Sequence, residues 1–250
     1  MLENYYDSEF ELRFFEMDKW GEASATTILT LLEETAANHC LSIDHSLYYL
    51  IEKQVGWVLR AGAMEMYRYP RYKEKITIRT WLSSYSAIRG IRENIIYDEQ
   101  QNIIGRAKGL WVFFDVAKRR PTQIFDAIMQ RWMFCSKVCL DTDINTKIEP
   151  LHAATYCREF EVKRYDIDMN QHVNNIRYLQ WVIESLPNDI FEHYSLESID
   201  GRFVAEAHFG DTLISFTEEN GRPDAFIHTV KVKGTDKVCA TATTTWKKRV

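Results

Sequence analysis

Residues 166–173 read DIDMNQHV and lie between a short strand-like segment and an amphipathic helical pattern. Residues 16–23, 150 positions earlier, read EMDKWGEA and lead into a similar helical pattern. The same offset of 150 pairs Glu34 with Glu184 inside the two helical patterns. Any two α+β domains share some alternation of this kind, but a constant offset across strand, turn and helix favours two copies of one unit.

Each copy is predicted to contain one long helix. In the first copy, apolar and small residues recur at spacings of three and four over residues 28–39, with Ser24 as the N-cap. In the second copy, the apolar face runs over residues 176–186, with Asn174 as the N-cap and Pro187 as the stop.

Strand-like segments surround each predicted helix. Before the helices they are residues 10–15 and 160–162, and after them residues 76–81, 90–97, 105–114, 212–217, 226–232 and 238–246. An Asn220-Gly221 pair between two of these segments is a strong hairpin signal. We therefore predict an α+β fold in which each copy packs one long helix on an antiparallel sheet, with the boundary in the polar segment 141–150.

The composition is that of a globular protein, because 46% of the 250 residues are hydrophobic and 27% are charged. The net charge of −5 leaves no excess of cations to neutralise phosphates, so we do not expect nucleic acid as a partner. Five cysteines are an odd number in a long chain and indicate reduced thiols rather than a disulfide framework.

The first residues, MLENYYD, lack the basic lead and the apolar core of a signal peptide. The longest apolar stretches, such as residues 110–114, are too short to cross a bilayer. We therefore expect neither secretion nor a membrane partner, and we predict a cytoplasmic protein.

Common nucleophile, metal and cofactor motifs are absent from the sequence. It contains no G-x-S-x-G elbow, no H-E-x-x-H pair, no G-x-x-x-x-G-K phosphate loop and no G-x-G-x-x-G fingerprint. The closely spaced Cys135 and Cys139 lack the further ligands of a zinc site. We expect no metal and no cofactor.

Asp168, Asn170 and His172 alternate with other residues just before the second helix. In an extended backbone alternate side chains project to the same side, so a carboxylate, an amide and an imidazole would face one place. The helix N-terminus adds amide donors and a positive dipole end, which suit a developing oxyanion. The alternative is a structural turn in which these side chains make only local hydrogen bonds.

The first copy helps to separate these two interpretations. Its corresponding residues are Asp18, Trp20 and Glu22, so the amide and the imidazole occur in the second copy alone. A purely structural turn would need similar residue types in both copies. The difference therefore favours a duplicated fold with one active copy.

With these features the chain resembles the fatty acyl-ACP thioesterases, the double hot-dog enzymes of plant plastids and bacteria. The resemblance rests on the run DMNQHVNN at residues 168–175, on the duplication and on the length, and it covers nearly the whole chain. It implies a tandem double hot-dog fold of the α+β class. Residues 1–145 would form an N-terminal hot-dog that binds the acyl chain, and residues 146–250 a catalytic C-terminal hot-dog.

The resemblance also implies the residues of the catalytic site, which are Asp168, Asn170, His172 and Glu206. The glutamate lies in the segment FVAEAHFGD at residues 203–211. Plant members commonly have a cysteine after this glutamate, where the present chain has Ala207, so no cysteine nucleophile is available at that position.

Two tryptophans of the first copy are expected to contact the substrate. The segments GWVL, which contains Trp57, and TW, which ends in Trp81, resemble the acyl-binding domain of the family. Each tryptophan taken alone is more often a core residue, so the substrate-binding role comes from the resemblance.

The predicted residues suit hydrolysis of a thioester. Either Asp168 or Glu206 can activate a water or attack the carbonyl carbon directly. Asn170 can hold the water or the carbonyl oxygen, and His172 can bond the carboxylate or protonate the leaving thiolate. We favour carboxylate-activated water, while the sequence leaves the route through a covalent anhydride open.

The expected reaction is hydrolysis of fatty acyl-ACP to a free fatty acid and holo-ACP, with acyl carrier protein as the partner. An acyl-CoA thioesterase, a hot-dog dehydratase and a non-enzymatic acyl-binding protein are alternatives. The dehydratase fits Glu206 and the Asp-x-Asn-x-His run less well, and hot-dog sensors carry a DNA-binding module for which we expect no room before Glu11. The sequence leaves open the chain length, the carrier, and whether the protein is a monomer or a homodimer.

Overall fold

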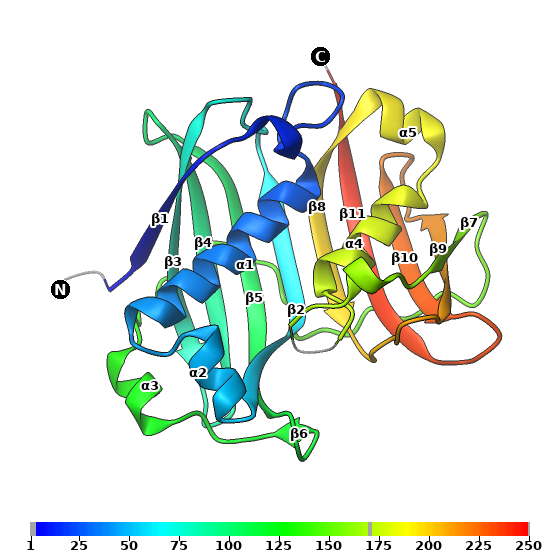
Figure 1. Cartoon of the computed structure of the whole chain (residues 1–250). Helices are drawn as coiled ribbons and strands as arrows, with labels where there is room; N and C mark the ends of the chain where they lie inside the picture. The colour runs from blue at the N-terminus through cyan, green and yellow to red at the C-terminus, as the bar shows by residue number, and fades with distance from the viewer. Residues whose placement is uncertain (1–3, 170–171, 250) are drawn as a thin grey trace. The chain divides into compact units, whose positions relative to one another are not determined.

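The computed structural model describes residues 4–169 and 172–249. The chain divides into two compact units (Figure 1). Unit 1 comprises Met1–Arg60 and Met64–Thr142, and unit 2 comprises Asp143–Val250 with the short Ala61–Ala63. Each unit holds one long helix against an antiparallel sheet, as the repeat predicts.

Unit 1 has a five-stranded sheet in the order β1-β3-β4-β5-β2, with the two-residue β6 paired to β5. The helix α1 packs against β1 and β3. The elements of unit 1 are β1 (Tyr6–Glu11), η1 (Phe14–Glu16), α1 (Ala25–Ser42), α2 (Leu47–Glu52), β2 (Val55–Met66), β3 (Lys75–Tyr85), β4 (Arg89–Asp98), β5 (Ile103–Asp115), β6 (Arg120–Pro121) and α3 (Asp126–Arg131).

Unit 2 repeats this plan in the strand order β7-β9-β10-β11-β8, and α4 packs against β9, β10 and β11. Within the described part of the chain, β6 and α3 have no counterpart in unit 2. Its elements are β7 (Tyr156–Glu161), η2 (Arg164–Asp166), α4 (Asn175–Glu184), α5 (Asn188–His193), β8 (Tyr194–Phe203), β9 (Thr212–Glu219), β10 (Ala225–Val232) and β11 (Val238–Lys248).

Both predicted helix caps are confirmed. Ser24 Oγ accepts a hydrogen bond from the backbone N–H of Thr27 at 3.0 Å, and Asn174 Oδ1 accepts one from Ile176 N–H at 2.8 Å. These bonds satisfy amide donors that the first turn of a helix otherwise leaves unpaired. Pro187 lies three residues after the end of α4 and occupies the N-cap position of α5, without a side-chain hydrogen bond.

One predicted strand is wrong in its extent. The sequence predicts a strand over residues 10–15, but β1 ends at Glu11 and Phe14–Glu16 is a 3-10 turn. The turn forms because the carboxylate of Glu16 accepts a hydrogen bond from Arg13 N–H at 2.6 Å. Phe14 and Phe15 are consequently 80% and 74% exposed, although two adjacent aromatic residues are typical of a strand.

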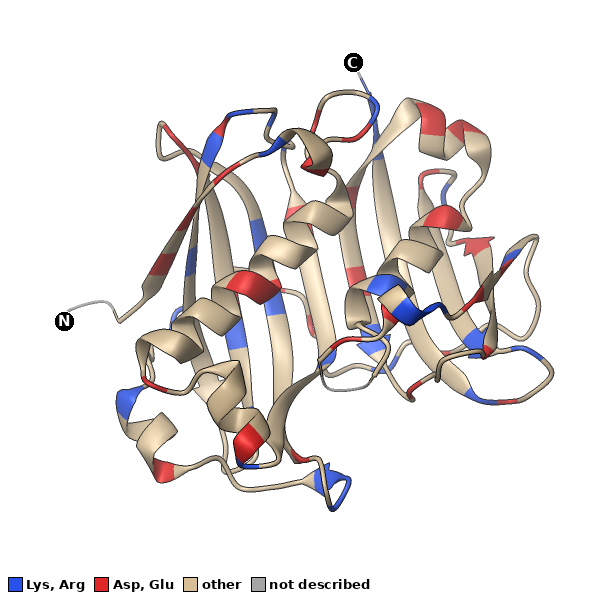
Figure 2. Ribbon diagram, in the orientation of Figure 1, with Lys and Arg blue, Asp and Glu red and all other residues tan. Residues whose placement is uncertain are grey.

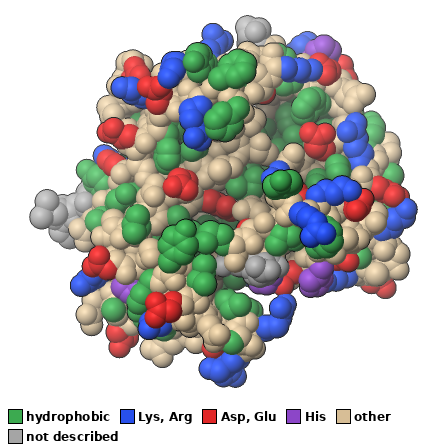
Figure 3. Space-filling model, in the orientation of Figure 1, with side chains coloured by type: hydrophobic (Ala, Val, Ile, Leu, Met, Phe, Trp, Pro, Cys, Tyr) green, Lys and Arg blue, Asp and Glu red, His purple; other side chains and the backbone are tan. Residues whose placement is uncertain are grey.

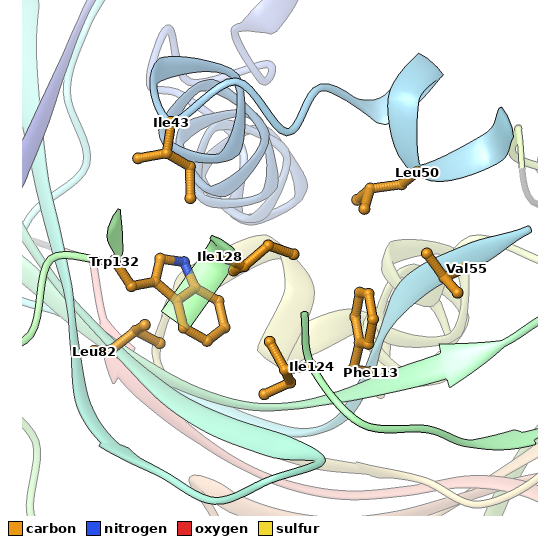
Figure 4. Close-up of a cluster of buried hydrophobic side chains, with 8 residues drawn as sticks. All are labelled: Ile43, Leu50, Val55, Leu82, Phe113, Ile124, Ile128 and Trp132. Carbon is orange, nitrogen blue, oxygen red and sulfur yellow. The ribbon is translucent and has the colours of Figure 1, made fainter. Parts of the chain in front are cut away.

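A cluster of buried apolar side chains fills unit 1 beside α2 and α3 (Figure 4). Its members are Ile43, Leu50, Val55, Leu82, Phe113, Ile124, Ile128 and Trp132. Because Ile128 and Trp132 come from α3 and its end, the segment that unit 2 lacks in the described chain enlarges the core of unit 1.

Lys, Arg, Asp and Glu are interspersed along the elements of both units (Figure 2). None of the described helices has both the length and the apolar character needed to cross a bilayer.

Candidate active site

The turn that contains the predicted catalytic run closes on itself just before α4. Asp168 N–H donates to the carbonyl of His172 at 2.8 Å, and His172 N–H donates back to Asp168 Oδ1 at 3.3 Å. Ile167 and Val173 form an antiparallel bridge across the base of the turn. One carboxylate oxygen of Asp168 therefore fixes the backbone of His172. Asn170 lies outside the described residues.

The segment that carries Glu206 follows the end of β8. The backbone N–H groups of Val204 and Ala205 both donate to the carbonyl of Cys239 on β11, at 2.8 and 3.3 Å. On the other side of Glu206, the N–H of Ala207 donates to the hydroxyl of Tyr178 at 2.8 Å. The glutamate is thus held between two anchored neighbours.

The two segments bring His172 and Glu206 together. His172 Nδ1 lies 3.4 Å from Glu206 Oε1, and the two side chains are 21% and 33% exposed. This partial exposure leaves the pair accessible from solvent. A carboxylate beside Nδ1 favours the tautomer whose proton is on that atom and leaves Nε2 as an acceptor.

Several amides at this helix start are already engaged. Asn174 N–H donates to the carbonyl of Asp166 at 2.9 Å, and Ile176 N–H is taken by the N-cap. His172 N–H is taken by Asp168. These three amides are therefore not available to an oxyanion, although the sequence predicts that amides at this helix N-terminus could stabilise one.

Exposed aromatic and basic side chains flank the candidate site in sequence. Tyr165 on η2 is 93% exposed, and Phe209, three residues after Glu206, is 54% exposed. The guanidinium of Arg164 lies 4.7 Å from the centroid of the Phe209 ring, a cation–π arrangement. Figure 3 shows hydrophobic side chains interspersed with charged ones over the face that it presents.

The two tryptophans predicted to bind substrate have different surroundings in unit 1. Trp81 is 3% exposed and its indole N–H donates to the carbonyl of Lys137 at 2.8 Å, so it is a satisfied core residue. Trp57 is half-buried at the edge of the apolar cluster, with ring centroids 4.8 Å from Phe113 and 4.9 Å from Trp132. Trp57 is therefore the better placed of the two to contact an apolar ligand.

The structure adds one residue that the sequence analysis does not select. Tyr178 is 2% exposed and is the side-chain partner of the segment that holds Glu206. Its signal in the sequence is a tyrosine within the predicted second helix, six residues after His172. Among the described residues, no three His, Cys, Asp or Glu side chains gather as metal ligands would.

Family models match both units of this chain. The acyl-ACP thioesterase N-terminal domain matches residues 3–132, and the acyl-ACP thioesterase C-terminal domain matches residues 150–248. The chain belongs to the acyl-ACP thioesterase family. This confirms the family resemblance that the sequence shows.

Relatives and solved structures agree with this membership. The oleoyl-acyl carrier protein thioesterase of Coriandrum sativum is 30% identical over 254 residues, which cover 95% of this chain and 68% of the relative. Oleoyl-acyl carrier protein thioesterase 1 of Arabidopsis thaliana is 26% identical and covers 98% of this chain and 76% of the relative.

Solved acyl-ACP thioesterases share the fold over the whole chain. An acyl-ACP thioesterase from Bacteroides thetaiotaomicron superposes with a TM-score of 0.86 at 22% identity, over 98% of each chain. The 12:0-ACP thioesterase from Umbellularia californica gives 0.85 at 23% identity, again over 98% of each chain. The predicted α+β tandem double hot-dog is therefore confirmed.

Proposed function

We propose that the chain hydrolyses the thioester of fatty acyl-ACP and releases a free fatty acid and holo-ACP. Membership of the family supports the reaction, and plant relatives carry oleoyl- or palmitoyl-acyl carrier protein thioesterase as their names. The observation that carries the proposal is the approach of His172 Nδ1 to Glu206 Oε1 at 3.4 Å in a partly exposed position.

Glu206 is the general base in this proposal. Its carboxylate takes a proton from a water whose oxygen attacks the thioester carbonyl carbon. The tetrahedral intermediate then expels the sulfur as the C–S bond breaks, and the proton on Glu206 passes to the leaving sulfur to give the thiol. His172 hydrogen-bonds the carboxylate through Nδ1 and keeps it directed at the water.

Asp168 and Asn170 have supporting roles. Because Asp168 Oδ1 accepts a hydrogen bond from His172 N–H at 3.3 Å, we assign the aspartate to holding the histidine in place. For Asn170 we retain the role implied by the family, which is to hold the water or the carbonyl oxygen. Replacement of Asn170 by Ala tests that role by activity.

The N-terminal hot-dog, residues 1–145, is proposed to bind the acyl chain, and the C-terminal hot-dog, residues 146–250, to carry out the chemistry. The position of Trp57 against the apolar cluster supports the first assignment. Trp81 stays a proposed contact on the family resemblance alone, because its side chain is buried in the core. Replacing Trp57 by Ala should shift the preferred acyl length while the rate on the best substrate changes by less than about tenfold. An unchanged preference would place the acyl chain elsewhere.

The proposed partner is acyl carrier protein, and the proposed compartment is the cytoplasm, although the plant relatives are named as chloroplastic. The test of reaction and carrier together is thiol release from one acyl group on ACP and on CoA, with Asn170→Ala as the comparison. Fast release from acyl-ACP that falls about 100-fold or more in the variant supports the proposal. Faster release from acyl-CoA changes the carrier, and no release from either contradicts hydrolysis.

A further inference from the structure

The hydroxyl of Tyr178 reaches the backbone next to Glu206 from a different element. Tyr178 lies on α4, the helix that begins three residues after His172, and its Oη accepts the hydrogen bond from Ala207 N–H at 2.8 Å. The helix that follows the histidine turn therefore also fixes the segment of the glutamate.

The equivalent place in unit 1 lacks both halves of this hydrogen bond. Leu12 N–H donates to Glu74 O at 3.0 Å in unit 1, and Val162 N–H donates to Asp211 O at 2.9 Å in unit 2. Because these two hydrogen bonds match, Glu74 corresponds to Asp211, so this part of the two units is related by an offset of 137 residues. At this offset Ala207 corresponds to Pro70, which has no N–H.

The helix residue differs as well. At the offset of 150 that relates the two helices, Tyr178 corresponds to Ile28, which has no hydroxyl. Donor and acceptor are thus both present in the unit with His172 and Glu206, and both absent from the other unit.

We propose that Tyr178 is a positioning residue for Glu206, and that its hydroxyl holds the carboxylate at the distance from His172 that turnover requires. The inference rests on the proposed function, because it assigns Glu206 to the reaction. The competing explanation is that the hydroxyl only satisfies a buried amide, since Ala207 is 1% exposed. That explanation predicts a loss of stability with an unchanged turnover number.

The surroundings of Tyr178 allow its hydroxyl to be removed without moving its ring. The ring is buried, packs edge-on against Trp181 with centroids 5.5 Å apart, and contacts Phe203 with centroids 6.2 Å apart. Burial also raises the pKa of Tyr178 above its ordinary value, so the hydroxyl stays neutral. Tyr178→Phe therefore deletes one hydrogen bond and keeps the packing.

The test is a double-mutant cycle of Tyr178→Phe and Glu206→Gln, read as steady-state hydrolysis of acyl-ACP. We expect Tyr178→Phe alone to lower kcat about tenfold with KM within about twofold, the loss expected for a slightly misplaced group. In the Glu206→Gln background the same change should alter the rate by less than about twofold, because the residue acts through the glutamate. Tyr194→Phe, at the opposite end of β8 from Glu206, is the matched control and should match wild type.

Hydrogen exchange of residues 204–207 gives a second readout that does not depend on turnover. Tyr178→Phe should speed exchange there, and Tyr194→Phe should not. A wild-type kcat in Tyr178→Phe, or equal rate losses with and without Glu206, overturns the positioning role while leaving the proposed reaction intact. If Tyr178→Phe folds poorly, Tyr178→Met takes its place in the cycle. Wild-type hydrolysis by Glu206→Gln alone removes the glutamate from the reaction, and the inference fails with it.

Discussion

Two hydrogen bonds between the first and last residues of the turn that begins at Asp18 recur in the turn that begins at Asp168. In unit 1, Asp18 N–H donates to Glu22 O at 2.7 Å, and Glu22 N–H donates to Asp18 Oδ1 at 3.1 Å. In unit 2, the same two hydrogen bonds join Asp168 and His172, with lengths of 2.8 and 3.3 Å. Each turn is closed by a short antiparallel bridge. The aspartate common to both turns therefore makes the turn, and the histidine is what unit 2 adds.

The second element of the candidate site differs in the same way. At the offset of 137, Glu206 corresponds to Tyr69, which is 8% exposed. Unit 1 thus has neither the imidazole nor the carboxylate at these positions. The two units share one order of helix and strands, and what distinguishes the candidate site of unit 2 is the side chains at these matched positions.

The largest expected effect is on turnover at the position of the glutamate. Glu206→Gln removes the proposed base at nearly constant volume and should lower kcat on acyl-ACP by about 10²–10⁴-fold. Tyr69→Phe, the matched change in unit 1, should leave kcat within about twofold. Steady-state kinetics of both purified variants measure this, and equal losses would break the asymmetry between the units.

A smaller effect concerns acid stability, in which the two units should be alike. Burial lowers the pKa of His39 in unit 1 to about 3, with the charge of Arg92 as a further cause, and burial lowers the pKa of His228 in unit 2 to about 3. Both histidines are neutral in the folded chain, whereas unfolded histidine binds a proton below about pH 6.5. The stability that the two neutral histidines give to the folded chain is therefore complete above pH 6.5 and is lost as the pH falls toward 3.

Between pH 6 and 4, each histidine should lower the free energy of unfolding by about 1.4 kcal/mol for each unit by which the pH falls. Urea midpoints measured at half-unit steps from pH 7.5 to 4.5 test it. His228→Gln should remove the contribution of one histidine to this dependence of the free energy of unfolding on pH. A free energy of unfolding that stays level down to pH 5 would contradict the burial of both groups in neutral form.

The smallest effect is expected where the turns are alike. Asp18→Ala and Asp168→Ala each remove a side-chain acceptor of a turn amide and should cost about 1 kcal/mol of stability. Asp168→Asn keeps an oxygen at the same place, so its kcat should stay within about tenfold of wild type. Thermal unfolding and kinetics measured in parallel check both statements. A loss in Asp168→Asn as large as that in Glu206→Gln would make the aspartate carboxylate part of the chemistry.

The sequence predicted the features that local rules control. The caps Ser24 and Asn174 follow from short-range hydrogen bonding between a side chain and the first turn of its own helix. The strands β2 and β8 were not predicted, because buried residues do not alternate along either of them.

The candidate site was predictable only in part. The backbone turn around Asp168 is local, but the approach of Glu206 to His172 joins residues 34 positions apart and came from the family resemblance alone. The role of Tyr178 is not predictable from the sequence for a similar reason. Its hydroxyl has meaning only once the partner amide of Ala207, on another element, is known.

The most direct test of the central claim, that one unit of a duplicated fold performs the chemistry, is thiol release from acyl-ACP by His172→Ala beside Glu22→Ala. The two variants alter the same position of the same turn in the two units. We predict that His172→Ala loses about 100-fold or more in kcat while remaining folded, and that Glu22→Ala stays within about twofold of wild type. Wild-type turnover by His172→Ala, or a matching loss in Glu22→Ala, would contradict the claim.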